Sequence, residues 1–334
     1  MLVSGGRGAT ITGLGTALPD RVVTNAELAL TLDTSDEWIR QRTGIQARRV
    51  ADVGVSSSDL GIAAARAALA DAGLSAEQVG LVLTATISPD QLMPATAARI
   101  AHGVGAVNAG SCDISAGCTG FVYALALATG MVSGGLHDHV LVVGAEVISR
   151  ILDWEDRSTA ILFGDAAGAA VISPAAGVGR ILGFDLGTDG SGVDLLAVPA
   201  GGSRLPASHE TVDQRQHYLR MNGREVFRFA TRVIIDSAAR VLEQCGRTIE
   251  EIDLFVPHQA NLRIIDAAVH RMGIPRDRVC TNLERYGNTS CASIPLCLDE
   301  ARAAGRLREG DLVLLMGFGA GLTWGACLME WGGT

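Results

Sequence analysis

Short, continuous apolar segments alternate with longer segments of helical periodicity along most of the chain. Continuous apolar runs of strand length occupy residues 79–87, 139–145 and 312–316. Such runs are typical of strands that are buried on both faces of a parallel sheet. Apolar residues three and four positions apart predict helices at residues 58–73, 94–104, 227–245 and 261–272. The pattern therefore predicts an α/β protein whose helices cover the sheets.

The order of the predicted elements repeats in the second half of the chain. That half adds strands at 252–256 and 278–283 and a helix at 290–304. Leu81 aligns with Leu254 and Gly144 with Gly317, both with an offset of 173 residues (254 − 81 and 317 − 144). A shared offset across elements in the same order indicates an internal duplication. We predict an N-terminal half at residues 1–175 and a C-terminal half at 176–334, joined at the stretch 174–179.

The first fifty residues are less regular. Residues 8–19 alternate apolar and small residues, which predicts a strand, and residues 25–32 predict a short helix. Capping residues at 33–35 precede a second helix. Residues 40–49 are basic and polar, and we expect them to be exposed.

Composition excludes several classes of function. All 27 basic residues are arginine, because the 334-residue sequence contains no lysine. Schiff-base chemistry, pyridoxal phosphate and the P-loop each require a lysine amine, so these mechanisms are excluded. The formal net charge of −9 argues against general nucleic-acid binding. The net charge does not exclude an acidic partner protein, because arginines that cluster locally can still bind one.

Cysteine usage and the apolar runs indicate the compartment. The seven cysteines are odd in number and scattered through apolar segments, which predicts reduced thiols. No Cys or His cluster has the spacing of a zinc site, so we expect no metal. No apolar run reaches the roughly 20 residues that cross a bilayer, and the first eight residues lack a signal-peptide core. We expect a cytoplasmic protein with no membrane partner.

The turn at residues 113–121 carries the strongest candidate nucleophile. A strand-like run at 109–115 leads into it, and an alanine-rich helical stretch at 122–131 leads out. Cys118 then lies at a helix N-terminus, where unpaired backbone N–H groups and the helix dipole favour the thiolate. Gly117 and Gly120 allow a sharp bend and leave room for a substrate. The alternative is that Cys118 is a small buried side chain that only packs.

Two other strand–helix junctions carry residues that suit the same chemistry. His258 follows the strand at 252–256, and Asn288 lies in a turn that opens the helix at 290–304. If the duplication brings the junctions together, a thiolate attacks a carbonyl while neutral His and Asn N–H groups stabilise the developing oxyanion. As structural alternatives, His258 would cap its helix and Asn288 would hold a left-handed turn. The three residues together favour nucleophilic acyl chemistry.

With these junctions, the chain resembles the β-ketoacyl-acyl-carrier-protein synthase III family of thiolase-like condensing enzymes over nearly its whole length. The motifs that carry the resemblance are Thr34-Ser35-Asp36-Glu37-Trp38-Ile39, Arg42-Thr43-Gly44-Ile45, Ala116-Gly117-Cys118-Thr119-Gly120-Phe121, Phe163-Gly164-Asp165, Val256-Pro257-His258-Gln259-Ala260-Asn261-Leu262-Arg263, Gly287-Asn288-Thr289-Ser290 and Gly317-Phe318-Gly319-Ala320-Gly321. The resemblance implies a homodimer with a thiolase-like fold, in which two duplicated α/β halves form a layered αβαβα core.

The resemblance also implies a reaction in two stages. An acyl group is loaded from acyl-coenzyme A onto Cys118, and a malonyl group on acyl carrier protein is then decarboxylated and joined to it. His258 and Asn288 would stabilise the thioester enolate as neutral donors. The backbone N–H groups of Cys118 and Ala320 would form the oxyanion hole. No cofactor is implied, since acyl-coenzyme A is a substrate.

Further positions bear on the acyl pocket. By the same resemblance, Phe318 and Phe227 would line the active site. Met93 falls where many relatives place a phenylalanine that reaches across the dimer, and the more pliable methionine would admit a longer or branched acyl group. Ala320 replaces a usual glycine and Cys291 a common alanine. A thiolase would carry a second reactive cysteine at residues 317–321, which have none, so a thiolase is disfavoured.

The resemblance also implies which residues bind coenzyme A. Trp38 would stack on the adenine with Arg157 on the other face, although Trp38 is alternatively a core aromatic. The mouth of the pantetheine tunnel would be lined by Arg42, Thr34, Asn261 and Arg263. A patch for an acidic carrier protein, or merely a solvated face, would comprise Arg224, Arg228, Arg263 and Arg271.

Three functions are compatible with these residues. The first is a condensing enzyme that starts fatty-acid or polyketide chains. The second keeps the acyl-Cys118 intermediate but passes the acyl group to an oxygen or nitrogen acceptor of a specialised pathway. The third is a non-catalytic subunit, which the intact Cys, His and Asn set disfavours. The sequence does not identify the acyl group.

Overall fold

The continuous apolar runs form the central strands of two sheets in the computed structural model, which describes residues 7–332. In hydrogen-bonded order, the first sheet contains β1 (Ala9–Ala17), β7 (Ala166–Pro174), β6 (Val140–Glu146), β4 (Leu81–Ala85) and β5 (Gly110–Ile114). The second contains β11 (Leu254–Pro257), β12 (Leu312–Gly319), β13 (Thr323–Glu330) and β8 (Arg180–Thr188). Every residue of β6 and β12 is buried, which explains their unbroken apolar sequences.

The two sheets repeat the same strand directions. β4 runs parallel to β6 as β11 does to β12, and the next two pairings are antiparallel in both sheets. The register repeats too, because the pair Leu81–Val140 recurs as Leu254–Val313, 173 residues later (254 − 81 and 313 − 140). The predicted duplication and thiolase-like fold class are thus confirmed. The sheets lie on either side of residue 175, while the boundary itself stays a prediction.

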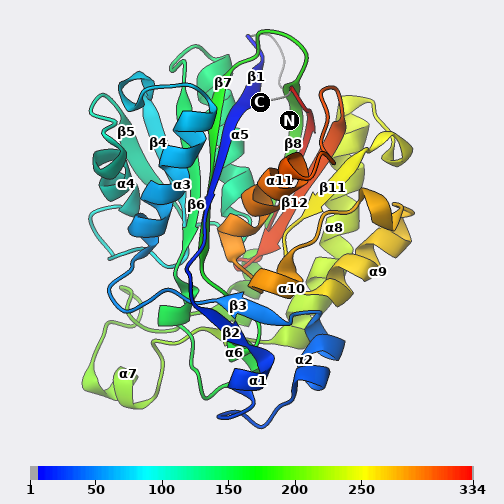
Figure 1. Ribbon diagram of the computed structural model, residues 1–334. Coiled ribbons are helices and arrows are strands. Elements are labelled where there is room, and N and C mark those ends of the chain that lie inside the picture. Colours follow the sequence, from blue (N-terminus) through cyan, green and yellow to red (C-terminus); the bar gives the residue numbers. More distant parts are fainter. Residues whose placement is uncertain (1–6, 333–334) are drawn as a thin grey trace.

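Helices complete five layers, which Figure 1 shows from the side. α5 (Gly120–Ser133) and α11 (Ser293–Ala303) lie between the sheets and pack against both through one apolar core. α3 (Ser57–Asp71) and α4 (Thr96–Val104) cover the outer face of the first sheet. α8 (Gly223–Cys245) and α9 (Leu262–Met272) cover the outer face of the second. The apolar sequence of α5 on nearly all sides follows from this central position.

The remaining elements gather at one end of the layers, at the bottom of Figure 1. They are β2 (Val22–Thr24), α1 (Asn25–Leu28), α2 (Asp36–Thr43), β3 (Ala47–Arg49), α6 (Arg157–Ala160), β9 (Leu196–Ala197), α7 (His209–Asp213), β10 (Arg220–Met221) and α10 (Leu283–Tyr286). In the described residues 7–332, no helix is both long and apolar enough to cross a membrane.

The strand predicted at residues 278–283 is wrong. Only one bridge forms there, between Val279 and Phe255, and α10 begins at Leu283. The buried side chain of Gln259 replaces the missing strand partner, since its Nε2 donates to the Cys280 carbonyl at 3.2 Å. Its Oε1 accepts the backbone N–H groups of Asn282 and Leu283. A side-chain amide thus satisfies buried backbone groups that a strand would otherwise pair.

The expectation that residues 40–49 are exposed is wrong at Thr43, Ile45 and Arg48, which are buried, and Arg48 is the charged one among them. Its side chain is fully buried, because the strand alternation of β3 points residue 48 inward. The guanidinium donates to the Val23 and Ile161 carbonyls and to Asn25 Oδ1, at 3.2, 2.7 and 2.9 Å. Burial lowers the pKa of Arg48 to about 10, so the group is still charged at neutral pH. Arg48 therefore joins β2, α1 and the end of α6.

Replacing Arg48 by lysine tests this joint. A lysine ammonium cannot span three acceptors placed for a planar guanidinium, and buried acceptors left without donors cost about 1–3 kcal/mol each. We expect Arg48→Lys to lower the free energy of unfolding in urea by about 3 kcal/mol. The exposed Arg308→Lys serves as the control and should change it by less than about 0.5 kcal/mol. Equal effects of the two variants would contradict the assignment.

Candidate active site

Two glycine-containing loops, one from each half, meet where Cys118 lies. The chain bends after β5, and Cys118 stands two residues before the first residue of α5. A Cβ on Gly117 would lie 2.7 Å from the backbone N of Ala320, and one on Gly319 would lie 2.6 Å from the backbone N of Cys118. Only glycine permits so close an approach. The contact brings the backbone of Ala320 next to the Cys118 turn.

The predicted nucleophile, histidine and asparagine line one cavity of about 120 Å³. The other walls of this cavity, named here the Cys118 cavity, are mostly apolar: Leu162, Phe163, Leu196, Met221, Gly223, Val226, Phe227, Ala260, Asn261, Ile264, Phe318 and Gly319. Cys118 and His258 come from opposite halves of the duplication, and Asn288 follows α10. The structure thus brings the three together, and their catalytic roles stay predictions.

Asn288 is oriented by its own backbone neighbourhood. Its Oδ1 accepts the Ser290 N–H at 2.9 Å, and its backbone N–H donates to the Leu162 carbonyl at 2.8 Å. Because the amide oxygen is used in this way, the Nδ2 group is left to donate into the cavity. The left-handed positions of this loop are Gly287 and Ser290, and the Asn288 side chain holds the second of them, so its structural alternative keeps support beside the catalytic one.

His258 is a buried, neutral imidazole. Its Nδ1 lies 2.8 Å from Ser293 Oγ, and its ring meets Phe318 edge-on with centroids 5.2 Å apart. Burial lowers the pKa of His258 to about 3. Asn261 caps α9, since its Oδ1 accepts the Arg263 N–H, so His258 is not a helix cap.

Cys118 differs from the expectation in its protonation. Its side chain is 4 % exposed, and burial raises the pKa of the thiol to about 12. The Ser290 hydroxyl opposes this pKa shift, and the negative charge of Glu146 adds to it. The prediction that the helix N-terminus favours a thiolate is therefore wrong for the resting site, because desolvation outweighs the favourable groups. A proton must leave the sulfur when it attacks.

Sequence reasoning missed Glu146, the last residue of β6. The carboxyl is fully buried and accepts Ser88 Oγ at 2.6 Å and the backbone N–H groups of Ile87 and Ser88 at 3.1 and 3.2 Å. Burial raises the pKa of Glu146, and these donors oppose the shift. The available signal was a single acidic residue at the end of the otherwise apolar run 140–145.

Other predicted residues fall into two groups. Phe227, Phe318 and Asn261 line the Cys118 cavity, whereas Ala320 only borders it through its contact with Gly117. Met93 is 82 % exposed and does not line this cavity within the described part of the chain.

The residues predicted to bind coenzyme A gather around Trp38. The guanidinium groups of Arg157 and Arg42 lie 4.9 and 5.7 Å from the Trp38 ring centroid. Asn261 Nδ2 donates to the Arg42 carbonyl at 3.1 Å, which ties α2 to the cavity wall. Arg263 lies over the ring of Phe227, at 5.8 Å from its centroid, and the buried Thr34 hydroxyl has no hydrogen-bond partner in residues 7–332. Trp38 also packs on a small apolar cluster, so both interpretations of it keep support.

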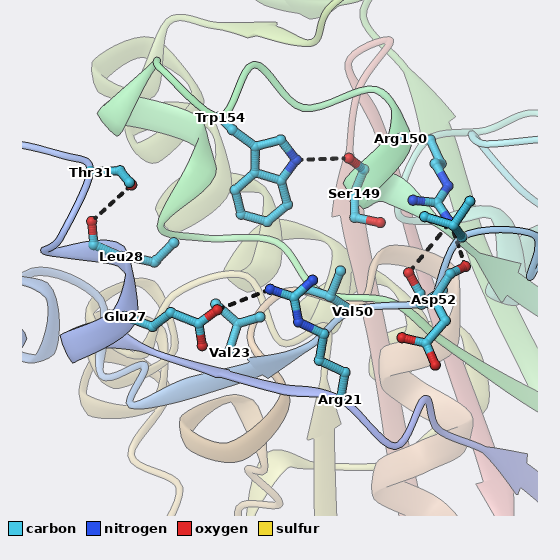
Figure 2. A pocket seen from close by; sticks show the side chains of 12 residues that line it. Arg21, Val23, Glu27, Leu28, Thr31, Val50, Asp52, Ser149, Arg150 and Trp154 are labelled. Atoms are coloured by element: carbon cyan, nitrogen blue, oxygen red, sulfur yellow. Dashed lines mark hydrogen bonds and ion pairs between the residues drawn. The ribbon is translucent and has the colours of Figure 1, made fainter.

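A larger cavity of about 410 Å³ lies under α1, and Figure 2 shows it from close by. Its polar groups are already engaged: Arg21 pairs with Glu27 at 2.9 Å, and Arg150 donates to the Asp52 carbonyl at 2.6 Å. Trp154 donates to the Ser149 carbonyl at 3.1 Å. Its lining residues include no cysteine or histidine, so the larger of these two cavities is not the one that carries the predicted catalytic residues.

No group of three or more His, Cys, Asp or Glu side chains in residues 7–332 is arranged to hold a metal ion. All seven cysteines are unpaired.

Comparison with known proteins gives one consistent result. Family models described as 3-oxoacyl-[acyl-carrier-protein (ACP)] synthase III and its C-terminal part match residues 112–190 and 242–331. A β-ketoacyl-[acyl-carrier-protein] synthase III of Symbiobacterium thermophilum is 53 % identical over 96 % of this chain and 98 % of its own.

Solved structures agree with this result. A synthase III from Thermus thermophilus is 50 % identical, with a TM-score of 0.91 over 97 % of this chain and 100 % of its own. The priming β-ketosynthase of the R1128 polyketide biosynthetic pathway is 38 % identical, with a TM-score of 0.90 over 100 % and 99 %.

These matches, with the duplicated fold, place the protein among the condensing enzymes of the acyltransferase class. The chain belongs to the 3-oxoacyl-[acyl-carrier-protein] synthase III family.

The neutral state of His258 makes a testable prediction about acid stability. Its pKa is about 3 in the folded protein and 6.5 ordinarily, so only the unfolded chain binds this proton between those values. Stability is therefore lost as the pH falls below about 6.5. Between pH 7.5 and 5.5, we expect His258→Asn to lose about 1.4 kcal/mol less unfolding free energy than the unmodified protein.

Chemical denaturation at the two pH values measures this difference. His102→Asn is the matched control, because it removes an exposed imidazole outside the site. If His258→Asn follows the same pH dependence as the unmodified protein, the imidazole is not held neutral.

Proposed function

We propose that the chain loads an acyl group from acyl-coenzyme A onto Cys118 and condenses it with malonyl-acyl carrier protein, with release of carbon dioxide. The main support is that Cys118, neutral His258 and the Asn288 amide line one buried, mostly apolar cavity. In a site that excludes water, the hydrogen bonds from the few polar groups to the reacting thioester are stronger than they would be in water.

In the first stage, the sulfur of Cys118 attacks the acyl carbonyl carbon and coenzyme A leaves as a thiol. The oxyanion that develops needs N–H donors that are already in place. The backbone N–H groups of Cys118 and Ala320 are suited to this role, because the Gly117 contact holds the two loops together. The apolar rings of Phe227 and Phe318 exclude water from the thioester.

In the second stage, the malonyl thioester loses carbon dioxide and its enolate attacks the acyl-Cys118 carbonyl. The bond from the acyl carbon to the Cys118 sulfur then breaks, and the sulfur takes up a proton to return to the thiol. The Asn288 Nδ2 group donates to the enolate oxygen, and the neutral His258 ring adds no full charge that would hold the malonyl carboxylate. If Asn288 acts only in the second stage, its removal should slow decarboxylation and leave acyl loading of Cys118 nearly unchanged.

Mass spectrometry of the intact protein with acetyl-coenzyme A, followed by addition of malonyl-acyl carrier protein and measurement of carbon dioxide, tests the function. We expect one acetyl group on Cys118, then a β-ketoacyl product on the carrier. No carbon dioxide from malonyl-acyl carrier protein with any short acyl-coenzyme A would overturn the proposal.

Asn288→Ala tests the separation of the two stages. We expect acetyl loading within about threefold of the unmodified rate and a loss of about 10²–10³ in decarboxylation, as for other removed oxyanion donors. Asn108→Ala, at an exposed asparagine, is the control and should affect neither stage. A loading defect as large as the decarboxylation defect would show that Asn288 serves mainly to hold the cavity in shape.

The mouth of the site suits the nucleotide of coenzyme A. Trp38 offers an indole ring with two guanidinium groups 4.9 and 5.7 Å from its centroid, and cations beside an aromatic ring attract both a purine and its phosphates. We therefore keep Trp38, Arg157, Arg42, Thr34, Asn261 and Arg263 as the proposed coenzyme A contacts.

Trp38→Ala tests this contact against Trp154→Ala, which alters the second cavity. We expect the KM for acetyl-coenzyme A to rise about tenfold in Trp38→Ala, which corresponds to about 1.4 kcal/mol. The KM for acetyl-pantetheine, which lacks the nucleotide, should not change. Equal loss with both substrates, or an equal effect of Trp154→Ala, would contradict adenine recognition.

Assembly and partners extend the proposal. Within residues 7–332, β5 pairs only with β4, and Leu92, Met93 and Val107 nearby are at least 80 % exposed. An open strand edge beside apolar side chains favours a homodimer, with Met93 facing the partner's acyl pocket. Arg224, Arg228, Arg263 and Arg271 are exposed on α8 and α9, whose first turns line the Cys118 cavity, which suits an acidic carrier protein. Seven unpaired cysteines suit a cytoplasmic location.

Relatives at 49 % identity or more over almost their full length carry the synthase III name, which disfavours an oxygen or nitrogen acceptor. Among the two pathways, fatty-acid initiation has the more similar relatives, since the polyketide ketosynthase is 38 % identical.

A further inference from the structure

The neutral imidazole of His258 carries one proton, which either of its two nitrogens can bind. The nitrogen that binds the proton donates a hydrogen bond, and the other nitrogen offers a lone pair that accepts one. The two tautomers therefore act in opposite ways on whatever enters the Cys118 cavity, which the ring lines. The partner of Nδ1 decides which tautomer is present.

The partner of Nδ1 is the Ser293 hydroxyl, whose own proton is used elsewhere. Ser293 Oγ lies 2.8 Å from His258 Nδ1 and also 2.8 Å from the Ser290 carbonyl oxygen. A carbonyl oxygen can only accept, so the hydroxyl proton lies between Ser293 Oγ and Ser290. If this proton pointed to His258 instead, two oxygen lone pairs would face each other at 2.8 Å in a buried place. The hydroxyl therefore accepts a hydrogen bond from Nδ1–H.

The other contacts of His258 leave Nε2 without a partner. The backbone N–H of His258 donates to the Met316 carbonyl at 2.7 Å, and Phe318 meets the ring edge-on. Among residues 7–332, no hydrogen bond reaches Nε2, whereas Nδ1 is bound to Ser293. With the proton on Nδ1, the ring offers the Cys118 cavity a lone pair and no N–H group.

The first half of the chain shows that the fold does not require this polar pair. The residues equivalent to His258 and Ser293 are Ala85 and Gly120, 173 positions earlier (258 − 85 and 293 − 120). A Cβ on Gly120 would lie 3.0 Å from Ala85 Cβ, so the end of the strand meets the start of the central helix in both halves. Two small residues make this contact in the first half. The hydrogen-bonded pair is found only in the half that supplies His258 to the site.

We propose that Ser293 is a positioning residue that keeps the proton of His258 on Nδ1, so that the ring acts as a hydrogen-bond acceptor in the Cys118 cavity. This inference rests on the proposed function. The resemblance implied that His258 and Asn288 both donate to the enolate. With this tautomer, the Asn288 amide is the N–H donor of the two. The group that meets Nε2 must itself carry a proton, as a thiol or an amide of the pantetheine arm does.

NMR of the protein labelled with ¹⁵N-histidine tests the tautomer without any substrate. The chain has seven histidines, and the signals that disappear in His258→Asn belong to His258. We expect a protonated Nδ1 and an unprotonated Nε2, which differ widely in ¹⁵N chemical shift. In Ser293→Ala, the acceptor for Nδ1–H is gone, and we expect signals of the Nε2–H tautomer. Ser237→Ala removes a buried hydroxyl on α8, outside the site, and should keep the original spectrum.

Steady-state kinetics test whether the position of the proton matters for the reaction. Ser293 does not line the Cys118 cavity, so its removal should leave the KM for acetyl-coenzyme A unchanged. We expect Ser293→Ala to lower kcat for formation of the β-ketoacyl product about tenfold, the size of one lost hydrogen bond. Ser237→Ala should keep both constants.

An Nε2–H signal of His258 in the unmodified protein would overturn the inference, and this measurement stands even if Ser293→Ala does not fold. An unchanged tautomer or an unchanged kcat in folded Ser293→Ala would overturn it as well. An Nδ1–H signal in an unmodified protein that loads no acetyl group would instead overturn the proposed function and leave the tautomer assignment in place.

Discussion

The site depends on how closely two backbones approach each other between the halves. Side chains at residues 117 and 319 would collide with Ala320 and Cys118, so glycine at both positions lets the loops touch. The same device recurs deeper, where a Cβ on Gly144 would lie 2.4 Å from the Cys291 carbonyl. Because these contacts join the ends of central, fully buried strands, the sulfur, the imidazole and the carboxamide are held by rigid elements.

Burial then decides the protonation state of each group. It raises the pKa of Cys118 and Glu146 and lowers that of His258, in each case against the charged form. Burial thus disfavours the charged form of each of these groups, which suits a reaction in which a malonyl carboxylate must enter and lose its charge as carbon dioxide.

The sequence was informative wherever a pattern reflects one local cause. Unbroken apolar runs predicted β6 and β12, and capping residues predicted the start of α2. It failed where a distant side chain decides local structure, as when Gln259 replaces a strand at 278–283 or Arg48 turns inward. The thiolate prediction for Cys118 failed for a related reason, since the local helix end was visible in the sequence and the surrounding desolvation was not.

The duplication explains why one site forms and not two. The residue equivalent to Cys118 is Cys291 (291 − 118 gives the same 173), which also precedes a central helix and is equally buried. Yet Cys291 donates to the Gly117 carbonyl and does not line the Cys118 cavity, and the position equivalent to His258 in the first half is Ala85 (258 − 85). In the second half, the Cys291 thiol is therefore a packed side chain and the contribution to the site is His258. The first half contributes the nucleophile Cys118. The halves have become complementary parts of one active site.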